Sequence, residues 1–222
     1  MSKNPIIDAL EHIREKHIRD TFRDFLSLAM SALTKDENAY QEVLRRYGNS
    51  DEKAHVAENH FAKALAVFFE ETARDSSIDH LGRAHETSGL SNANTGQFFT
   101  PESLSDLCAE LTLPEFDDSR PVSVSDPCCG SGRMLISAMR RLHVDSWFYA
   151  VDVDSMCVDM CALNLLVRNA NAYVVHGNAL SLDAYGGYLL NRTFFGGVVR
   201  KISTDLAQKV IQTGLKTQGQ AA

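Results

Sequence analysis

A regular alternation of short β-type runs and helical stretches begins near residue 120 and constrains the fold more than any other feature of this chain. β-Branched and aromatic residues are concentrated in VSVSD (122–126), WFYAVD (147–152) and AYVVHG (172–177). The two stretches between these runs carry apolar residues at helical spacing. Strand, helix, strand, helix, strand is the pattern of a parallel sheet with crossover helices. The sequence therefore predicts an α/β fold with three neighbouring parallel strands.

The N-terminal part of the chain has a different pattern, with apolar residues at helical spacing through 6–33 and again through 56–68. Gly48-Asn49-Ser50-Asp51 separates these two predicted helices. Neither helix can bury its apolar stripe alone, so each must pack against another element. We therefore predict a helical region over 1–90, almost wholly helical through 5–75, and an α/β domain over 91–222.

The composition predicts neither membrane insertion nor a metal site. The longest apolar stretches are far shorter than a membrane span, and the N-terminus mixes charges of both signs, so no signal peptide or anchor is expected. The five cysteines lack the spacing of a disulfide framework, which favours reduced thiols and a cytoplasmic location. Cys157 and Cys161 have no His or Cys pair at zinc spacing, so core packing explains them better than a metal.

Charge is distributed unevenly along the chain. The net charge is −7, which is unsuited to a protein that grips nucleic acid over its whole surface. Residues 186–222 contain five Lys and Arg against one Asp, so this tail carries +4 and the remainder −11. The tail is either a local contact for DNA phosphates or an ordinary solvated helix face.

A glycine-rich turn follows the first predicted strand, in the segment Asp126-Pro127-Cys128-Cys129-Gly130-Ser131-Gly132. Glycines allow a ligand to approach the backbone closely, and the following helix N-terminus offers unpaired N–H groups. Such a turn alone is a weak indication, because many nucleotide-binding folds use one. Asp152 ends the next strand, 20 residues beyond Gly132, where such folds place a ribose-binding carboxylate.

The segment Gly96-Gln97-Phe98-Phe99-Thr100-Pro101 precedes a predicted helix through Leu104, Leu107 and Leu111. Thr100 is a good N-cap and Pro101 suits the first helical turn. Helix capping alone does not explain two adjacent aromatic residues, which suit a face for an adenine ring or a methionyl chain.

These segments resemble the amino-methylating, adenine-specific DNA methyltransferases of the modification subunits of type I restriction systems. The resemblance rests first on GQFFTP and DPCCGSGRMLI. It covers about residues 79–182, through DHLGRAHE (79–86), AVDVD (150–154), NLL (164–166) and GNAL (177–180). It implies a Rossmann-like class I S-adenosylmethionine-dependent methyltransferase core, here with an incomplete parallel sheet.

The resemblance also implies which residues bind S-adenosylmethionine. Asp126 is expected near the amino group of the cofactor, Asp152 at the ribose hydroxyls, and Asn178 at the adenine edge, where the family more often has Asp. The other residues expected in this site, most of them at the methionine end, are Gln97, Phe98, Phe99, Thr100, Pro101, Pro127, Cys128, Gly130, Ser131, Gly132 and Leu180.

The family's catalytic Asn/Asp-Pro-Pro-aromatic loop is not found in this sequence, which has no proline beyond Pro127. That loop accepts hydrogen bonds from the target amine and stacks on the flipped base. Asn191 and Phe194 have the right separation but lack the prolines between them, so they are weak catalytic candidates. The remaining length suggests one further strand and one helix, and therefore a truncated sheet.

Three functions remain open from the sequence. The first is that of an active adenine DNA methyltransferase. The second is that of a catalytically inactive, cofactor-binding regulator or scaffold of a modification system. The third is that of an interaction protein that has lost the ligand. The glycine turn and Asp152 argue against the third, and the missing loop argues against the first. A truncated sheet further predicts a homo-oligomer or a partner subunit, with weak DNA contact by the chain alone.

Overall fold

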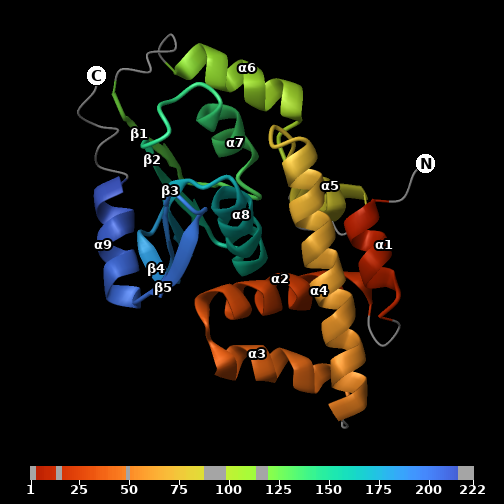
Figure 1. Cartoon of the computed structure of the whole chain (residues 1–222). Coiled ribbons are helices and arrows are strands. Elements are labelled where there is room, and N and C mark those ends of the chain that lie inside the picture. The colour runs from red at the N-terminus through yellow and green to blue at the C-terminus, as the bar shows by residue number, and fades with distance from the viewer. Residues whose placement is uncertain (1–3, 14–16, 49–50, 88–98, 114–119, 215–222) are drawn as a thin grey trace. The chain divides into compact units, whose positions relative to one another are not determined.

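The structure is a computed structural model, and it describes residues 4–13, 17–48, 51–87, 99–113 and 120–214. Two compact units are present (Figure 1). A helical unit comprises residues 1–76 and 80–98, and an α/β unit comprises residues 77–79 and 99–222.

The helical unit contains α1 (Pro5–Glu11), α2 (Ile18–Thr34), α3 (Glu37–Leu44), the short 3-10 helix η1 (Arg45–Tyr47), α4 (Asp51–Arg74) and α5 (His80–Thr87). Helix α4 packs against α1 and α2. The core includes five aromatic side chains that are at most 1% exposed, namely Phe22, Phe25, Tyr47, Phe61 and Phe68. The predicted helical character of residues 5–75 is confirmed for the described residues. The single helix predicted through 6–33 is wrong, because α2 begins anew after His17, whose side chain accepts a hydrogen bond from Arg19 N at 3.3 Å.

The α/β unit contains α6 (Glu102–Thr112), β1 (Ser123–Asp126), α7 (Arg133–Met139), β2 (Trp147–Asp152), α8 (Ser155–Val167), β3 (Asn171–Asn178), β4 (Asp183–Asn191), β5 (Val198–Ile202) and α9 (Thr204–Gly214). The five strands form one sheet in the order β1-β2-β3-β4-β5. β1 pairs with β2, and β2 with β3, in parallel. The prediction of three neighbouring parallel strands with helices between them is confirmed.

The second half of the sheet differs from the prediction. β4 and β5 are antiparallel to their neighbours, so the sheet is mixed, and two strands follow β3 where one was expected. Only residues 179–182 separate β3 from β4. A connection this short can join antiparallel strands, whereas a parallel crossover requires a dozen or more residues. The incomplete parallel sheet expected from the sequence is therefore corrected to a mixed sheet.

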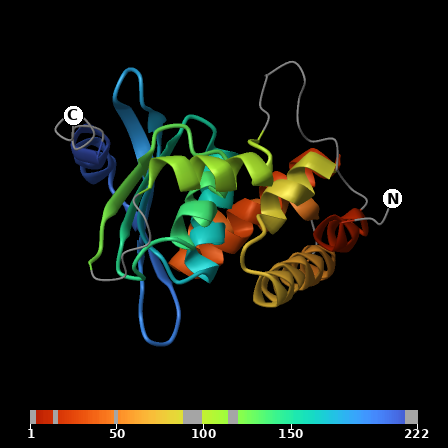
Figure 2. The same cartoon turned by 90° about the horizontal axis from the view of Figure 1, so that it is seen from above.

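Helices cover both faces of this sheet. Helix α7 packs on β1 and α8 on β2 and β3, while α9 packs on β2, β3 and β4 from the opposite side (Figures 1 and 2). Helix α8 is buried almost all round, which explains its apolar sequence. Because β1, β2 and β3 are parallel, the loops that follow them all lie at the carboxyl end of these strands, which we call the carboxyl edge of the sheet. Within the described part of the chain, no helix combines the length and apolar character needed to cross a bilayer.

Candidate cofactor site

The turn between β1 and α7 lies across the carboxyl end of β2. Cys129 N donates to Val151 O at 2.9 Å, and Gly132 N donates to Cys129 O at 2.8 Å. Gly130 and Gly132 have φ angles of +53° and +84°, a region that glycine enters without steric cost. The two glycines therefore allow the chain to reverse tightly after Asp126 and enter α7.

The surroundings of both glycines leave little space for a side chain. A Cβ at Gly130 would lie 3.0 Å from the Phe99 ring, and a Cβ at Gly132 would lie 2.9 Å from Cys161 Sγ of α8. The turn is thus held closely between the Phe99 ring and α8. Phe99 comes from the segment that the sequence associated with the cofactor, so the structure brings two of the predicted motifs together.

Two carboxylates end neighbouring strands beside this turn. Asp152 Oδ2 accepts a hydrogen bond from Gly130 N at 2.8 Å, and its Oδ1 accepts one from Asp154 N at 2.9 Å. Asp126 Oδ1 accepts one from Cys128 N at 3.1 Å. A carboxylate can accept about four hydrogen bonds, so both retain acceptor capacity. Asp152 is therefore part of the support of the glycine turn, a role the sequence did not indicate.

Burial dominates the electrostatics of this pair. It raises the pKa of Asp126 above the usual aspartate value, and the charge of Asp152 raises it further. Burial likewise raises the pKa of Asp152, although hydrogen bonds from Asp154 N and Gly130 N oppose the shift. Although Cys128 is largely exposed, partial desolvation and the charges of Asp152 and Asp126 raise the pKa of its thiol, which makes it a poor nucleophile.

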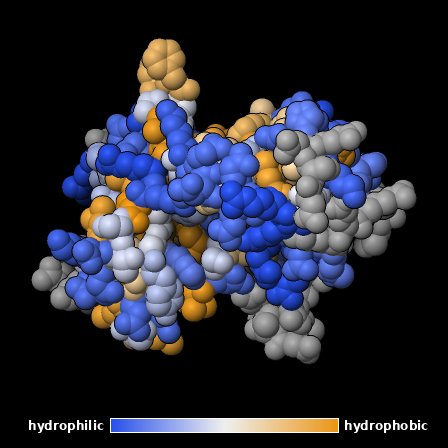
Figure 3. Space-filling view, turned by 90° about the horizontal axis from the view of Figure 1, so that it is seen from below, coloured by the Kyte–Doolittle hydropathy of each residue, from blue (hydrophilic) through white to orange (hydrophobic). Residues whose placement is uncertain are grey.

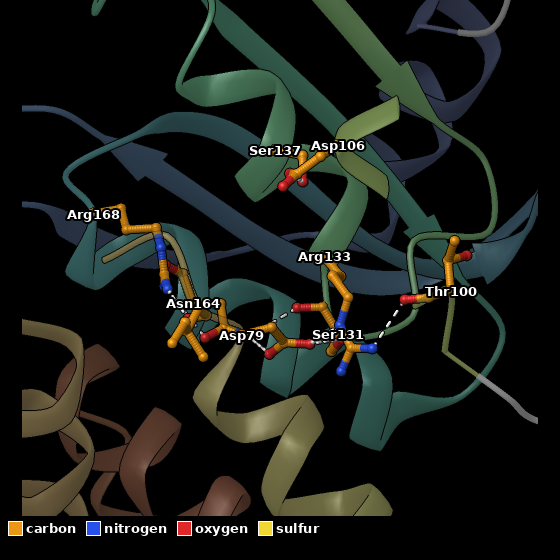
Figure 4. A network of polar contacts seen from close by, with 9 residues as sticks. Asp79, Thr100, Asp106, Ser131, Arg133, Ser137, Asn164 and Arg168 are labelled. Atoms are coloured by element: carbon orange, nitrogen blue, oxygen red, sulfur yellow. Dashed lines mark hydrogen bonds and ion pairs between the residues drawn. The ribbon is translucent and has the colours of Figure 1, made fainter. Parts of the chain in front are cut away.

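Asp79 is the centre of a buried polar network beneath the turn (Figure 4). Its side chain is fully buried, and its Oδ2 accepts hydrogen bonds from Ser131 Oγ at 2.5 Å and Arg133 Nε at 3.1 Å. Its Oδ1 accepts one from Asn164 Nδ2 at 2.8 Å, and the same nitrogen lies 2.9 Å from Ser131 O. Asp79 thus connects the glycine turn to α8.

Arg133 extends the network to the segment that carries Phe99. Its Nη1 donates to Thr100 O at 2.9 Å, and its guanidinium carbon lies 5.7 Å from the centre of the Phe99 ring. The Arg133 side chain is 7% exposed, so its ion pair with Asp79 is buried. Sequence reasoning gave Asp79 and Arg133 no role, because each partner lies more than 30 residues away.

The other predicted cofactor residues have varied positions. Gln97 and Phe98 lie outside the described residues. The Ser131 side chain is buried in the Asp79 network, while Pro127 and Cys128 are exposed. The expectation that Thr100 caps a helix is wrong, because α6 begins at Glu102 and its N-cap is Pro101, without a side-chain cap bond.

Asn178 and Leu180 lie where β3 ends. Asn178 Oδ1 accepts hydrogen bonds from Leu180 N at 2.9 Å and Ser181 N at 3.3 Å, which makes a local Asx turn. The Leu180 side chain is 96% exposed. Both residues are at the same edge of the sheet as Asp126 and Asp152, since β1, β2 and β3 are parallel.

Asn191 and Phe194 are not brought together with these residues. Asn191 ends β4, which is antiparallel to β3, and the neighbouring Arg192 N donates to Asn171 Oδ1 at the start of β3. Asp152 is paired with His176, which lies five residues beyond Asn171 along β3. Five residues correspond to roughly 15–20 Å of strand. The weak catalytic candidates therefore lie at the opposite end of the sheet from the predicted cofactor residues.

The described ranges contain no group of three or more His, Cys, Asp or Glu side chains arranged to hold a metal ion. Cys129, Cys157 and Cys161 are buried free thiols in the packing around α8.

The chain is similar in sequence to a known family and to two curated proteins. The sequence model of the family described as N-6 DNA Methylase matches residues 76–194, more than half of the chain. The chain is 26% identical over 172 residues to the "Type I restriction enzyme MjaIX methylase subunit" of Methanocaldococcus jannaschii, covering 74% of this chain and 27% of that protein. It is 26% identical over 128 residues to the "Type I restriction enzyme MpnII methylase subunit" of Mycoplasma pneumoniae, covering 52% of this chain and 23% of that protein.

These matches span about a quarter of the length of the two relatives. No solved structure matches the chain significantly.

Proposed function

Because this chain belongs to the N-6 DNA methylase family, we propose that it binds S-adenosylmethionine at the carboxyl edge of β1, β2 and β3. The observation that supports this most directly is the pair Asp126 and Asp152, which lie half-buried beside the glycine turn. Burial raises the pKa of both, and among the described residues no Lys or Arg forms an ion pair with either. A ligand that contributes an ammonium group and hydroxyl donors suits such a site, since hydrogen bonds to carboxylates are strong.

The chemistry of the residues fits the parts of this cofactor. We assign Asp126 to its amino group and Asp152 to its ribose hydroxyls, through the lone pairs that the backbone bonds leave available. The glycine turn and the Phe99–Pro101 segment are assigned to the methionine end, and Asn178 with Leu180 to the adenine edge. The backbone at Gly130 supports the assignment, because a residue with a side chain would be strained at its φ of +53° and its Cβ would lie 3.0 Å from the Phe99 ring.

We further propose that the reaction served by this site is methylation of the exocyclic amine of adenine in DNA. S-adenosylmethionine supplies an activated methyl group when bound. The role of this chain is to hold the cofactor in a fixed orientation next to the target base. The relatives are named methylase subunits, so we place the activity in an assembly of this chain with a second copy or a partner subunit.

One observation favours the alternative of a catalytically inactive, cofactor-binding regulator or scaffold. Asn191 and Phe194 were the only candidates for the part of the site that holds the base, and they lie at the far end of the sheet. Flipping a base costs a few kcal/mol, which stacking and hydrogen bonds in a pocket must recover. The chain alone is therefore expected to bind the cofactor without methylating DNA.

The test is to incubate the purified chain with S-adenosylmethionine carrying a tritiated methyl group and with unmethylated genomic DNA. We expect cofactor bound to the protein and no label in DNA, because the sequence offers no base-holding loop near Asp152. Adding the proteins encoded beside it distinguishes a subunit, which then labels DNA, from an inactive regulator. Label transferred by the chain alone and abolished by Asn191→Ala would contradict the placement of the site.

A further inference from the structure

Arg133 is the only lysine or arginine whose side chain is buried among the residues that the structure describes. Hydrophilic residues make up much of the surface seen in Figure 3, which is where charged side chains ordinarily lie. Arg133 is also the first residue of α7, and a cation is unfavourable at the N-terminus of a helix. Burial and position both disfavour this charge, so its contacts have to compensate for them.

The guanidinium contacts two segments of the α/β unit that precede α7 in the chain. Its Nε donates to Asp79 Oδ2 at 3.1 Å, and its Nη1 donates to Thr100 O at 2.9 Å (Figure 4). Its central carbon lies 5.7 Å from the centre of the Phe99 ring, within the range of a cation–π interaction. Side chains lean toward the N-terminus of their helix, so Arg133 extends back toward the glycine turn.

These contacts join the two places at which the chain passes between its compact units. The chain leaves the α/β unit after Asp79 and returns to it at Phe99. Arg133 binds one residue at the first of these places and contacts two at the second. It therefore attaches the returning segment to the start of α7, directly after the glycine turn.

Phe99 connects these contacts to the candidate cofactor site. The ring is half-buried and lies against Gly130, where a Cβ would be 3.0 Å from the ring carbons. The other parts of the site are held by separate bonds. Asp152 accepts from the backbone N of Gly130 and of Asp154, and Asn178 accepts from the backbone of its own turn. Loss of the Arg133 contacts therefore affects the Phe99 side of the glycine turn first.

We propose that Arg133 is a positioning residue that holds the Phe99–Pro101 segment against the glycine turn, so that the two together form the wall for the methionyl end of the cofactor. This inference rests on the proposed function. It adds that Arg133 determines how strongly the site prefers S-adenosylmethionine over nucleosides that lack the amino acid end. The ribose and adenine contacts assigned to Asp152 and Asn178 do not depend on it.

The variant Arg133→Lys tests this role. Lysine keeps the positive charge beside Asp79 but offers a single nitrogen, whereas the guanidinium uses separate nitrogens for Asp79 and Thr100. The full chain is titrated calorimetrically with S-adenosylmethionine and with methylthioadenosine, which keeps adenine and ribose but lacks the amino and carboxylate groups. We expect Arg133→Lys to weaken S-adenosylmethionine at least about tenfold and methylthioadenosine less than about twofold.

A second variant and a control accompany this measurement. Phe99→Leu removes the ring and leaves Arg133 and Asp79 in place, and it is expected to reduce the preference for S-adenosylmethionine in the same direction. Arg140→Lys is the matched control, because Arg140 follows the same helix and forms an exposed ion pair with Asp106. It should change neither affinity. Denaturant unfolding of each variant verifies that the titrated protein is folded.

The results separate this inference from the proposed function. Equal losses of both ligands in Arg133→Lys, or no loss of S-adenosylmethionine, would show that Arg133 supports only the fold and would overturn the inference. A wild type that binds both ligands equally tightly would also overturn it, while leaving a nucleoside site in place. A wild type that binds neither ligand would instead overturn the proposed function, and this inference with it.

Discussion

Replacing Asp79 by alanine is expected to lower the free energy of unfolding of the α/β unit by about 3–5 kcal/mol. The substitution leaves the Arg133 guanidinium buried without its carboxylate, together with the polar side chains of Ser131 and Asn164. Removing one partner of a buried ion pair costs far more than the intact pair contributes, because the remaining charge stays buried without the carboxylate that faced it. The stability of Asp79→Asn is expected to lie between that of the wild type and that of Asp79→Ala, because the amide oxygen can still accept a hydrogen bond.

Denaturant unfolding followed by tryptophan fluorescence measures this effect in the correct unit, because the single tryptophan, Trp147, lies in β2. Asp145→Ala is the matched control. It removes an exposed ion pair with Arg192, whose side chains are 55% and 39% exposed, and should cost less than about 1 kcal/mol. If Asp79→Ala costs no more than Asp145→Ala, the network does not stabilise the glycine turn.

Replacing Asp152 by alanine is expected to weaken binding of S-adenosylmethionine at least about tenfold. Two losses combine in this variant: the proposed bonds to the ribose hydroxyls, and the 2.8 Å bond that fixes Gly130 N. Calorimetric titration of both proteins measures the ratio of dissociation constants. The carboxylates are proposed to bind the cofactor as anions, and the pKa of Asp126 and of Asp152 is raised. On acidification, affinity should therefore begin to fall at a higher pH than it would for aspartates with the ordinary pKa.

Asp154→Ala is the control for this prediction. Asp154 is two residues away with the same charge, but its side chain caps α8 by accepting from Met156 N at 2.9 Å. Its loss should cost about 1 kcal/mol of stability while leaving cofactor affinity nearly unchanged. Equal loss of affinity in both variants would show that local charge or folding, and not Asp152 itself, governs binding.

The three parallel strands could be predicted because local sequence determines them. Each is a short β-branched or aromatic run, and the connection of the first contains glycines whose positive φ the turn requires. The antiparallel half of the sheet could not be predicted in this way. Gly186-Gly187 resembles a turn, yet it lies inside β4, where a Cβ at Gly187 would be 2.3 Å from Val174 O. The glycine permits close approach to β3, which only the paired strands reveal.

The candidate site likewise contains residues that could be predicted from the sequence and residues that could not. The family resemblance implied Asp126, Asp152 and Asn178 as a group, and the parallel strands bring all three to the carboxyl end of the sheet. Asp79 could not, since its partners Ser131 and Asn164 lie 52 and 85 residues away. The leucine spacing of α6 predicted a helix correctly. The spacing could not show that the leucines face solvent, because the sequence does not reveal that α6 packs on α7 through the face that carries Ser105 and Ala109.

The central claim is that this chain binds S-adenosylmethionine, and calorimetric titration of the wild-type protein tests it most directly. We expect saturable binding to one site per chain, displaced by S-adenosylhomocysteine, which keeps the amino, ribose and adenine groups assigned to Asp126, Asp152 and Asn178. A folded wild-type protein that shows no saturable binding at millimolar cofactor would contradict the account.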